Sequence, residues 1–432
     1  MKDLYDIFQE CGRKVCTDTR RIVPGSVFFA LKGENFDGND FAAAALEQGA
    51  AYAVVERTPE GADDRFVKVQ DTLQALQQLA RIHRLHFEIP VVGITGTNGK
   101  TTTKELVNAV LGAKYRTLCT KGNLNNHIGV PLTLLGLNED HQIAIVEMGA
   151  SHPWEIASSV SIALPTCGLI TNVGRAHLEG FGSFEGVKKT KGELYDFLNA
   201  TSGTVFYNAD SSDICGMVDK RDKLVKIAYG ARFQGVKILP ANVQEPFLRI
   251  GMPDGRVIRT RLVGAYNADN VLAALCVAKH FGVEEEAAVA AIEAYAPSNN
   301  RSQMVTTQSN TLIVDAYNAN HTSMLTSLEN FAATDFKEKV LILGDMYELG
   351  GFSLQAHADV LRKACSITSE IFLVGRGEFK AASSQVPEAS CAKFFDSAEA
   401  LRDYLGSHPL KGKTILLKGS NSNRLFILPE IL

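Results

Sequence analysis

The sequence lacks the features that place a chain in a membrane, in a disulfide framework or on nucleic acid. No apolar run approaches the roughly 20 residues needed to cross a bilayer, and charges occur throughout the amphipathic first segment. The eight cysteines are scattered without a Cys-x-x-Cys pair, which is typical of reduced thiols. A net charge of -4 gives no electrostatic reason to expect nucleic acid. We therefore expect a cytoplasmic protein without nucleic-acid binding or membrane insertion.

The length points to several domains. At 432 residues the chain exceeds one ordinary core, and roughly 150 residues per domain suggest about three. Pro90 follows a long helical pattern, and Ala-Pro-Ser-Asn-Asn at 296–300 is the best linker. These breaks predict domains at 1–88, 89–297 and 298–432.

The segment Val-Val-Gly-Ile-Thr-Gly-Thr-Asn-Gly-Lys-Thr-Thr-Thr-Lys-Glu, residues 91–105, predicts a buried strand, a glycine turn and a helix. Gly96 and Gly99 allow a tight turn that brings backbone N–H groups close to an anion. Lys100 adds a mobile positive charge, and the Thr101 hydroxyl can ligate Mg²⁺. The segment therefore predicts a phosphate-binding loop.

This loop is a variant of the usual P-loop. The common Gly-x-x-x-x-Gly-Lys-Ser/Thr spacing requires glycine at Ile94, whereas the glycine here is Gly93. The helix that follows directs its N-terminal dipole at the same place. An ordinary strand, turn and helix with accidental glycines is the alternative.

The pattern of apolar runs predicts an α/β protein. In the first unit it indicates strands at 26–31 and 51–55 and helices at 40–48 and 72–87. In the second it indicates a mostly parallel sheet with strands at 142–147, 167–173 and 204–207, an antiparallel addition at 230–262, and helices at 183–198, 267–281 and 284–295. In the third it indicates a doubly wound pattern with strands at 311–315, 340–344, 371–375 and 414–418 and a helix at 354–364. We expect a small α/β N-terminal domain, a central P-loop-type ATPase domain and a Rossmann-like C-terminal domain.

Two polar side chains follow apolar strands, where open α/β sheets bind ligands. Glu147 ends one strand and is placed to hold Mg²⁺ as a Walker-B-like carboxylate; a plain acid at the end of a strand is the alternative. His177 follows the next strand and could reach the same metal; a structural or surface histidine is the alternative. On spacing alone, Lys191 belongs with Lys188 and Lys189 to a solvated basic helix face.

Several motifs, in chain order, resemble the Mur ligases. They are Gly-Thr-Asn-Gly-Lys-Thr (96–101), Glu-Met-Gly-Ala (147–150), Ala-His-Leu-Glu-Gly-Phe-Gly (176–182), Lys-Gly-Glu (191–193), Asp-Ala-Tyr-Asn-Ala-Asn (315–320) and Gly-Asp-Met-x-Glu-Leu-Gly (344–350). The first fits any Mur ligase or folylpolyglutamate synthase, whereas the last two are more specific. They resemble the branch that joins D-alanyl-D-alanine to UDP-N-acetylmuramoyl-tripeptide. The resemblance runs from Thr17 to Ser420.

The resemblance implies an ATP- and Mg²⁺-dependent ligase of peptidoglycan precursor synthesis. Such an enzyme phosphorylates the terminal carboxylate of the UDP-sugar tripeptide, and the amine of D-alanyl-D-alanine attacks the acyl phosphate. The protein then has to position its substrates and neutralise their charge. We expect a monomer, and both diaminopimelate and lysine stay open as the third residue of the tripeptide.

The resemblance also implies roles for particular residues. The catalytic set is Lys100, Glu147, His177 and Lys191, with Thr101 and Glu147 on one Mg²⁺, His177 on a second, and Lys191 carrying a carbamate formed from CO₂ that ligates or orients the metal. ATP would contact Gly96, Thr97, Asn98, Gly99, Lys100, Thr101 and Thr102 through its phosphates, Asn267 and Asn270 through adenine, Arg301 through the phosphates and Asp315 through ribose. The alternative for the two asparagines is helix capping.

The substrate residues implied by the resemblance come from all three domains. The uridine nucleotide would meet Thr17, Asp18, Thr19, Arg20, Lys32 and Gly33, although the loops that carry these residues are also plausible as plain turns. The sugar-peptide would meet Asn123, Asn125 and Asn126, and the dipeptide would meet Asn318, Asn320, Lys418 and Ser420. The sequence departs from the family pattern at Trp154, where glycine is common, at Tyr266, where histidine is usual, and at His321, where proline is frequent.

Three rival functions remain at this point. A sister Mur ligase that adds a single amino acid is the nearest. A folylpolyglutamate synthase shares the phosphate loop, but it would not have a leading unit of about ninety residues before that loop. A nucleotide-binding module without enzymatic activity predicts no requirement for Glu147, His177 and Lys191.

Overall fold

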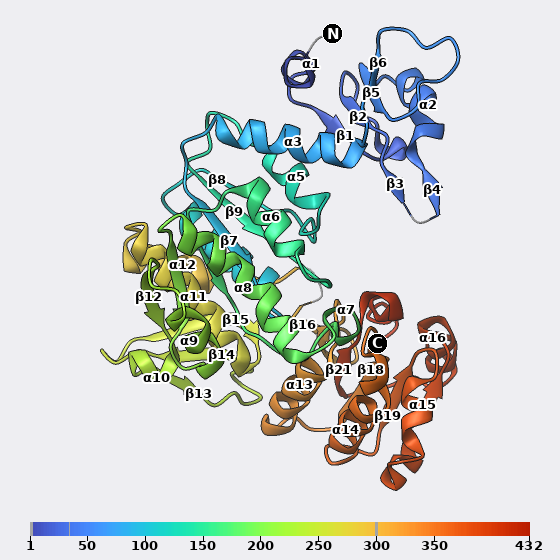
Figure 1. Cartoon of the computed structure of the whole chain (residues 1–432). Helices are drawn as coiled ribbons and strands as arrows, with labels where there is room; N and C mark the ends of the chain where they lie inside the picture. The colour runs from blue at the N-terminus through green and yellow to red at the C-terminus, as the bar shows by residue number, and fades with distance from the viewer. Residues whose placement is uncertain (1–2, 34, 299–300) are drawn as a thin grey trace.

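The computed structural model describes residues 3–33, 35–298 and 301–432 and has the expected three-domain α/β fold (Figure 1). The N-terminal domain is blue, the central domain runs from cyan to yellow, and the C-terminal domain is orange to red. Among the described residues, no helix is long and apolar enough to cross a bilayer.

The N-terminal domain is built on a parallel sheet in the order β1-β2-β5-β6. Its elements are α1 (Leu4–Glu10), β1 (Val15–Cys16), β2 (Val27–Phe29), the hairpin β3 (Lys32–Gly33) and β4 (Phe36–Asp37), α2 (Ala42–Glu47), β5 (Tyr52–Val55), β6 (Phe66–Lys68) and α3 (Thr72–Leu85). The two predicted strands and two predicted helices are confirmed with shorter bounds. The sequence patterns missed β1, β6 and the hairpin, whose two or three residues are too few to show a period.

Helix α3 joins this sheet to the central domain. Its first turn is capped by the Asp71 carboxylate, which accepts the Gln74 N–H at 2.8 Å. Near its end, the buried Arg84 donates to the Ala163 carbonyl at 3.1 Å, and His83 contacts the Leu137 carbonyl at 2.9 Å. The helix therefore packs on both domains, against α1 and β2 on one side and against α5 (Gly129–Leu134) and α6 (Glu155–Ala163) of the central domain on the other (Figure 1).

The central sheet has six parallel strands in the order β12-β11-β10-β7-β9-β8. Its elements are β7 (Val91–Thr95), α4 (Lys100–Gly112), β8 (Thr117–Cys119), α5 (Gly129–Leu134), β9 (Ile143–Glu147), α6 (Glu155–Ala163), β10 (Cys167–Ile170), α7 (Leu178–Phe181), α8 (Phe184–Ala200), β11 (Thr204–Asn208), α9 (Ser212–Asp219) and β12 (Val225–Tyr229). The neighbours of β7 both come later in the chain and lie on its two sides. The loop after β7 therefore opens at a topological switch point, between the ends of β9 and β10.

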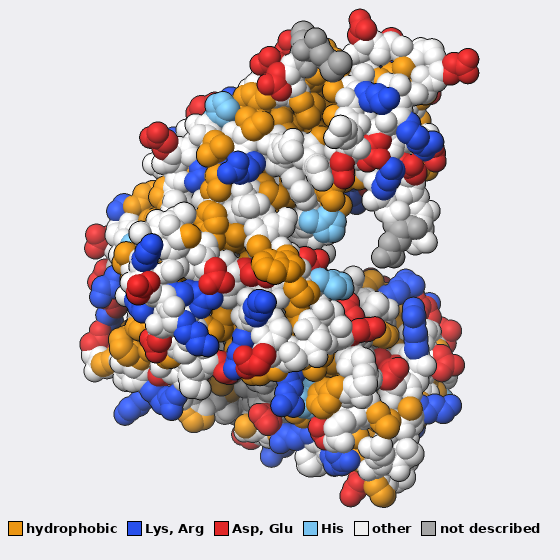
Figure 2. All heavy atoms as spheres, viewed as in Figure 1, with side chains coloured by type: hydrophobic (Ala, Val, Ile, Leu, Met, Phe, Trp, Pro, Cys, Tyr) orange, Lys and Arg blue, Asp and Glu red, His pale blue; other side chains and the backbone are white. Residues whose placement is uncertain are grey.

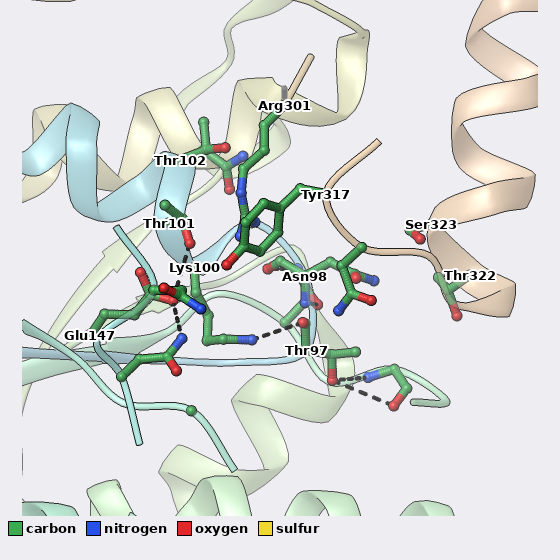
Figure 3. Close-up of a pocket in the computed structure, with 18 of the residues that line it drawn as sticks. Thr97, Asn98, Lys100, Thr101, Thr102, Glu147, Arg301, Tyr317, Thr322 and Ser323 are labelled. Atoms are coloured by element: carbon green, nitrogen blue, oxygen red, sulfur yellow. Dashed lines mark hydrogen bonds between the residues drawn. The ribbon is translucent and has the colours of Figure 1, made fainter. Parts of the chain in front are cut away.

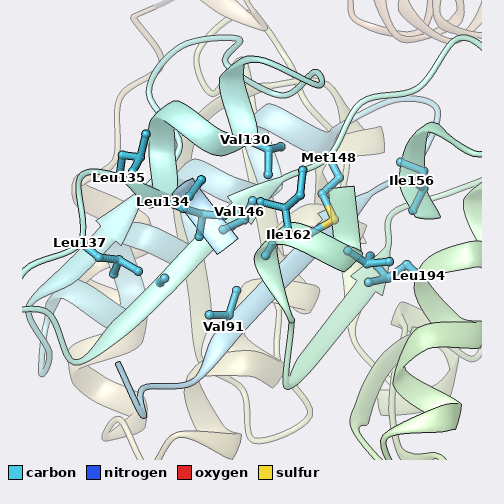
Figure 4. Packing of buried hydrophobic residues seen from close by; sticks show 14 of the residues in the cluster. Val91, Val130, Leu134, Leu135, Leu137, Val146, Met148, Ile156, Ile162 and Leu194 are labelled. Atoms are coloured by element: carbon cyan, nitrogen blue, oxygen red, sulfur yellow. The ribbon is translucent and has the colours of Figure 1, made fainter. Parts of the chain in front are cut away.

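Apolar side chains cover both faces of this sheet. Val91, Val146 and Met148 pack against Leu134 of α5 and Ile162 of α6 (Figure 4). Helices α4, α11 (Ala268–His280) and α12 (Glu285–Ala294) cover the other face. Burial of each large aliphatic side chain contributes about 1.5–3 kcal/mol, so the sheet is a rigid base for the loops at its edge.

The antiparallel addition is confirmed as β13 (Lys237–Leu239), β14 (Phe247–Gly251) and β15 (Val257–Val263). The start of the predicted segment instead forms the short helix α10 (Ala231–Gln234). Helices α11 and α12 agree with the predicted helices at 267–281 and 284–295.

The C-terminal sheet has the order β16-β17-β21-β18-β19-β20, parallel except for β16. Its elements are β16 (Gln303–Thr306), β17 (Thr311–Asp315), α13 (His321–Ala333), β18 (Lys339–Gly344), α14 (Ser353–Cys365), β19 (Ile371–Val374), α15 (Glu378–Ser383), β20 (Lys393–Phe395), α16 (Ala398–Ser407) and β21 (Thr414–Lys418). All four predicted strands and the predicted helix are confirmed, whereas β16 and β20 were missed. Residues 299 and 300 of the predicted linker lie outside the described residues.

Candidate active site

A pocket of about 620 Å³ lies where the end of the central sheet meets the C-terminal domain. The central domain lines it with the loops after β7, β8, β9 and β10 and with the start of α11. The C-terminal domain lines it with the residues just before β16, with the end of β17 and the residues after it, and with the last residue of β21 (Figure 3). In Figure 2 the molecule is hollowed on one side, between the N-terminal domain above and the C-terminal domain below. The pocket is therefore formed by the central and C-terminal domains, and the N-terminal domain lies on the other side of the hollow.

The two glycines of the phosphate loop are required by its geometry. Gly96 has a φ of +143° and Gly99 a φ of +77°. A Cβ atom at Gly96 would lie 2.0 Å from the Thr171 hydroxyl oxygen, and one at Gly99 would lie 2.7 Å from the Asn270 side-chain oxygen. The geometry of the turn therefore requires glycine at both positions, and phosphate binding by the loop stays a prediction.

The loop is held by the neighbouring strand β10. The Asn98 N–H donates to the Asn172 side-chain oxygen at 3.0 Å, and the Asn98 carbonyl accepts the Thr171 hydroxyl at 2.6 Å. From the C-terminal domain, the Asn320 amide donates to the Asn98 side-chain oxygen at 2.8 Å. Sequence reasoning missed Thr171 and Asn172, although their place at the end of a strand beside β7 is a usable signal.

Lys100 begins helix α4 and points into the loop. Its ammonium donates to the carbonyls of Gly96 at 2.9 Å and Thr97 at 3.0 Å (Figure 3). Although the residue is only half-buried by surface area, removal of its amine from water lowers its pKa to about 8, an effect that the nearby Glu147 charge opposes. At neutral pH the charged form still prevails, and a bound phosphate group would stabilise it further.

Glu147 ends β9 and is fully buried. Its Oε1 accepts the Thr101 hydroxyl at 3.1 Å and the Asn125 amide at 2.7 Å, and its backbone N–H donates to the Thr120 hydroxyl at 3.0 Å. Its Oε2 is buried and has no hydrogen-bond partner among the described residues.

A buried carboxylate oxygen without a partner is costly unless a cation meets it. Mg²⁺ prefers one or two carboxylates with hydroxyl, water and phosphate oxygens, and Glu147 beside the Thr101 hydroxyl fits that donor set. No three His, Cys, Asp or Glu side chains gather as a metal site in the described part of the chain. The residues present therefore fit a metal that takes most of its ligands from phosphate and water.

His177 lies across the same pocket and has a φ of +51°. Its Nδ1 contacts the carboxylate of Glu348 from the C-terminal domain. Burial lowers its pKa, which favours the neutral imidazole that a metal ligand must be, although Glu348 acts in the opposite direction. Sequence reasoning missed Glu348, which lies 171 residues away in sequence.

Lys191 is buried, with 2% of its surface exposed. Its amine donates to the Ala150 carbonyl at 3.2 Å, and Ala150 lines the pocket. Burial lowers its pKa well below the ordinary value, and the Lys100 charge adds to this. The solvated-face interpretation is therefore wrong for Lys191, because the helix turns it inward while Lys188 pairs with Glu185 at 2.9 Å.

Asn267 and Asn270 lie in the pocket wall, but they do not cap α11. The Asn267 amide donates to the Val263 carbonyl at 2.9 Å and the Ser302 hydroxyl at 3.2 Å, and the Asn270 amide donates to the Asn267 side-chain oxygen at 2.9 Å. Neither side chain bonds a backbone N–H of the first turn. The capping alternative is thus wrong, and the pair forms an ordered polar wall.

The C-terminal domain contributes opposite charges to the pocket. Arg301 stacks on the Tyr317 ring at 3.8 Å from its centroid, and the Arg301 Nε is buried without a hydrogen-bond partner among the described residues (Figure 3). Lys418 donates to the Asp315 carboxylate at 2.7 Å and to the Asn318 carbonyl at 3.1 Å. The predicted Arg301 and Asp315 therefore line the same pocket as the phosphate loop, and sequence reasoning missed Tyr317.

The structure brings most of the predicted site residues to this pocket. Those that line it are Thr97, Asn98, Gly99, Lys100, Thr101, Thr102, Asn123, Asn125, Asn126, Glu147, His177, Asn267, Asn270, Arg301, Asp315, Asn318 and Lys418. Gly96 is not among the residues that line it. Asn320 caps α13 and Ser420 caps a short turn at 421–423, so their side chains are engaged in the fold and outside the lining.

The predicted uridine residues are not part of the pocket. Arg20 pairs with Asp18 at 2.8 Å, and this contact lowers the pKa of Asp18 to about 2. Lys32 pairs with Glu56, and Gly33 lies in the β3-β4 hairpin. Thr17, Asp18, Thr19, Arg20, Lys32 and Gly33 lie in the N-terminal domain, outside the pocket lining.

The fold and this pocket define a class: a three-domain α/β protein with a pocket between its central and C-terminal domains, whose lining fits nucleotide phosphates and a divalent cation. Comparison with family models agrees. The chain matches the Mur ligase family catalytic domain at 13–84, the Mur ligase middle domain at 94–278, and the Mur ligase glutamate ligase domain at 300–421. The chain belongs to the Mur ligase family.

Similar proteins are found along the whole chain. A UDP-N-acetylmuramoyl-tripeptide--D-alanyl-D-alanine ligase from Synechocystis is 35% identical over 94% of this chain and 89% of its own, and one from Escherichia coli is 37% identical over 80% of this chain and 77% of its own. The crystal structure of MurF from Acinetobacter baumannii has a TM-score of 0.84 at 32% identity, covering 96% of this chain and 92% of its own. The crystal structure of MurF ligase from Thermotoga maritima in complex with ADP has a TM-score of 0.84 at 26% identity, covering 100% of this chain and 98% of its own.

Proposed function

We propose that the protein joins D-alanyl-D-alanine to UDP-N-acetylmuramoyl-tripeptide with hydrolysis of ATP, in the synthesis of peptidoglycan precursors. The observation that carries the proposal is the shared pocket, which is lined by the phosphate loop, Glu147 and Arg301. A buried carboxylate oxygen of Glu147 and the buried Arg301 Nε have no hydrogen-bond partner in the described part of the chain. Relatives with that activity match nearly the whole chain. The ATP requirement is supported by the ADP complex of a similar ligase.

The chain's own residues would act by positioning and charge neutralisation. Lys100 and the N–H groups at the start of α4 would hold the γ-phosphate during its transfer to the tripeptide carboxylate. Arg301 would neutralise the phosphates from the opposite side. Mg²⁺, held by Thr101 and Glu147 with a second ion near His177, would supply charge stabilisation at the phosphate oxygens. The amine of D-alanyl-D-alanine would then attack the acyl phosphate and release phosphate.

Lys191 is proposed to carry a carbamate. Burial lowers the pKa of the Lys191 amine and so favours its neutral form, which can attack CO₂ with loss of a proton from the nitrogen. The product is an anion next to Ala150 at the pocket wall, whereas an ammonium there would repel Mg²⁺.

The remaining assignments complete the proposal. The asparagines Asn267 and Asn270 would meet adenine, Asp315 ribose, Asn123, Asn125 and Asn126 the sugar-peptide, and Asn318, Asn320, Lys418 and Ser420 the dipeptide. Thr17, Asp18, Thr19, Arg20, Lys32 and Gly33 would hold the uridine nucleotide. Domain limits near residues 88 and 298, a monomeric state and a cytoplasmic location are part of the same proposal.

The test is a complete substrate matrix. ADP and phosphate should form only when UDP-N-acetylmuramoyl-tripeptide, D-alanyl-D-alanine, ATP and Mg²⁺ are all present. Turnover with a single amino acid, or with a folate and glutamate, and none with D-alanyl-D-alanine would reject the proposal.

A further inference from the structure

Trp154, the only tryptophan of the chain, combines two unfavourable features. Its φ of +70° lies in the left-handed region, which bulky residues rarely adopt. It is also 67% exposed to solvent, although its ring is largely apolar. Glycine would adopt this backbone without strain. An outlier of this kind beside a pocket is a reason to look for a function.

The loop that carries Trp154 forms part of the pocket wall. The residues from Gly149 to Ser151 before it and Glu155 after it all line the pocket. The Trp154 N–H donates to the Glu193 carboxylate at 3.0 Å, and the other oxygen of that carboxylate accepts an N–H one turn into α6 at 2.8 Å. The carboxylate therefore fixes the strained backbone, and the indole is held outside the pocket lining, beside its wall.

A free positive charge lies against the indole. The Lys189 ammonium is 5.6 Å from the centroid of the Trp154 ring. Within the described ranges, no carboxylate lies at ion-pair distance from Lys189, whereas its neighbour Lys188 pairs with both Glu185 and Asp213. The wall thus offers an apolar face with an unpaired cation at its edge.

We propose that Trp154 and Lys189 receive the side chain of the third residue of the tripeptide, an inference that rests on the proposed function. That residue carries the carboxylate to be phosphorylated, so its side chain branches from the carbon next to the reacting carboxyl carbon. Trp154 follows Glu147 on the same short loop, at the phosphate end of the site, whereas the uridine residues lie in another domain. The peptide, and not the nucleotide, therefore comes to this wall.

The chemistry of the wall also selects between third residues. The indole packs against a methylene chain in either case. Lys189 attracts a side chain that ends in a carboxylate beside its amine, as in diaminopimelate, and repels one that ends only in an ammonium, as in lysine. The wall therefore favours diaminopimelate.

Because the chain has one tryptophan, its fluorescence reports on this wall directly. The full-length protein should be titrated with UDP, with UDP-N-acetylmuramic acid and with the UDP-N-acetylmuramoyl-tripeptide, without ATP. We expect only the tripeptide to shift the emission to the blue and to protect it from acrylamide. The inference is overturned if the tripeptide leaves the emission unchanged, or if the ligand without peptide produces the same change.

Kinetics of Trp154→Gly give an independent test, because the backbone there suits glycine and the fold should be kept. The KM for the tripeptide substrate should rise about tenfold, while the KM values for ATP and D-alanyl-D-alanine and the melting temperature hold. Trp154→Phe should keep most of the affinity. Phe233→Ala, which removes a similarly exposed aromatic ring on α10, is the matched control and should change nothing.

Lys189→Met should reduce the preference for the diaminopimelate tripeptide over the lysine tripeptide about fivefold. An unchanged KM in Trp154→Gly, with a wild type that turns over, overturns this inference and leaves the proposed function standing. A wild type without turnover counts against the proposed function instead. The fluorescence titration then still tests whether Trp154 contacts the tripeptide.

Discussion

The two ends of the proposed substrate site are built differently. At the phosphate end, Glu147, Lys191 and Asn267 are buried and tied to their neighbours before any ligand is considered. At the uridine end, Arg20 and Lys32 lie on the surface of a separate domain and pair with nearby carboxylates. The difference teaches that the phosphate end is preorganised, and the proposed uridine site would reach it only if the N-terminal domain moves toward it.

Glu147→Gln should have the largest effect, because it removes the charge at the preorganised end and keeps the shape. The glutamine amide oxygen can still accept the bonds from Thr101 and Asn125. The amide nitrogen then takes the place of Oε2, which has no hydrogen-bond partner among the described residues. We expect kcat to fall about a thousandfold. The melting temperature, followed by circular dichroism, should stay the same or rise because a neutral amide replaces a buried carboxylate charge. Activity within tenfold of the wild type would show that Glu147 is only structural.

Lys191→Ala should come next, with activity close to zero and an intact fold. Short carboxylic acids at high concentration should restore part of the rate, because they replace the lost anion. Removal of CO₂ should lower wild-type activity, and bicarbonate should restore it. Lys188→Ala, on the exposed face of the same helix, is the control and should keep the wild-type rate. Full activity in Lys191→Ala would exclude the carbamate.

Arg20→Ala tests the uridine end of the proposed substrate site and should weaken the binding of one substrate only. The KM for the UDP-linked tripeptide should rise about tenfold, with the KM for ATP and the melting temperature unchanged, because the side chain is exposed. Arg65, which pairs with Asp63 at 2.7 Å in the same domain, provides a matched control. Equal effects of Arg20→Ala and Arg65→Ala would argue against a uridine site at Arg20.

The smallest expected effect is a change in the overall dimensions of the protein when its ligands bind. Solution scattering should show compaction when the UDP-linked tripeptide and a non-hydrolysable ATP analogue bind together, and less with the ATP analogue alone. A profile that stays the same with both ligands would contradict the idea that the N-terminal domain moves.

Local sequence patterns were sufficient to predict the long elements of the fold and those that carry a characteristic motif. The strand, glycine turn and helix around Lys100 were predictable because each step needs particular residues. Strands of two or three residues, such as β1, carry no readable period. The burial of Lys191 was hidden because charge spacing on a helix does not tell which face packs inward.

Contacts between residues far apart in sequence could not be predicted from the sequence either. The contact of His177 with Glu348 and the bond from Asn320 to Asn98 join residues more than 170 positions apart. Motif resemblance placed Asn125 and Asn320 in a site, but only the structure shows that Asn125 holds Glu147 and that Asn320 caps a helix.

The most direct test of the account follows the oxygen atoms of the reaction. UDP-N-acetylmuramoyl-tripeptide labelled with heavy oxygen in its terminal carboxylate should be converted with ATP, Mg²⁺ and D-alanyl-D-alanine, and the products analysed by mass spectrometry. Transfer of the γ-phosphate to the carboxylate predicts ADP, the pentapeptide product and inorganic phosphate that carries one labelled oxygen. Unlabelled phosphate, or AMP in place of ADP, would contradict the account.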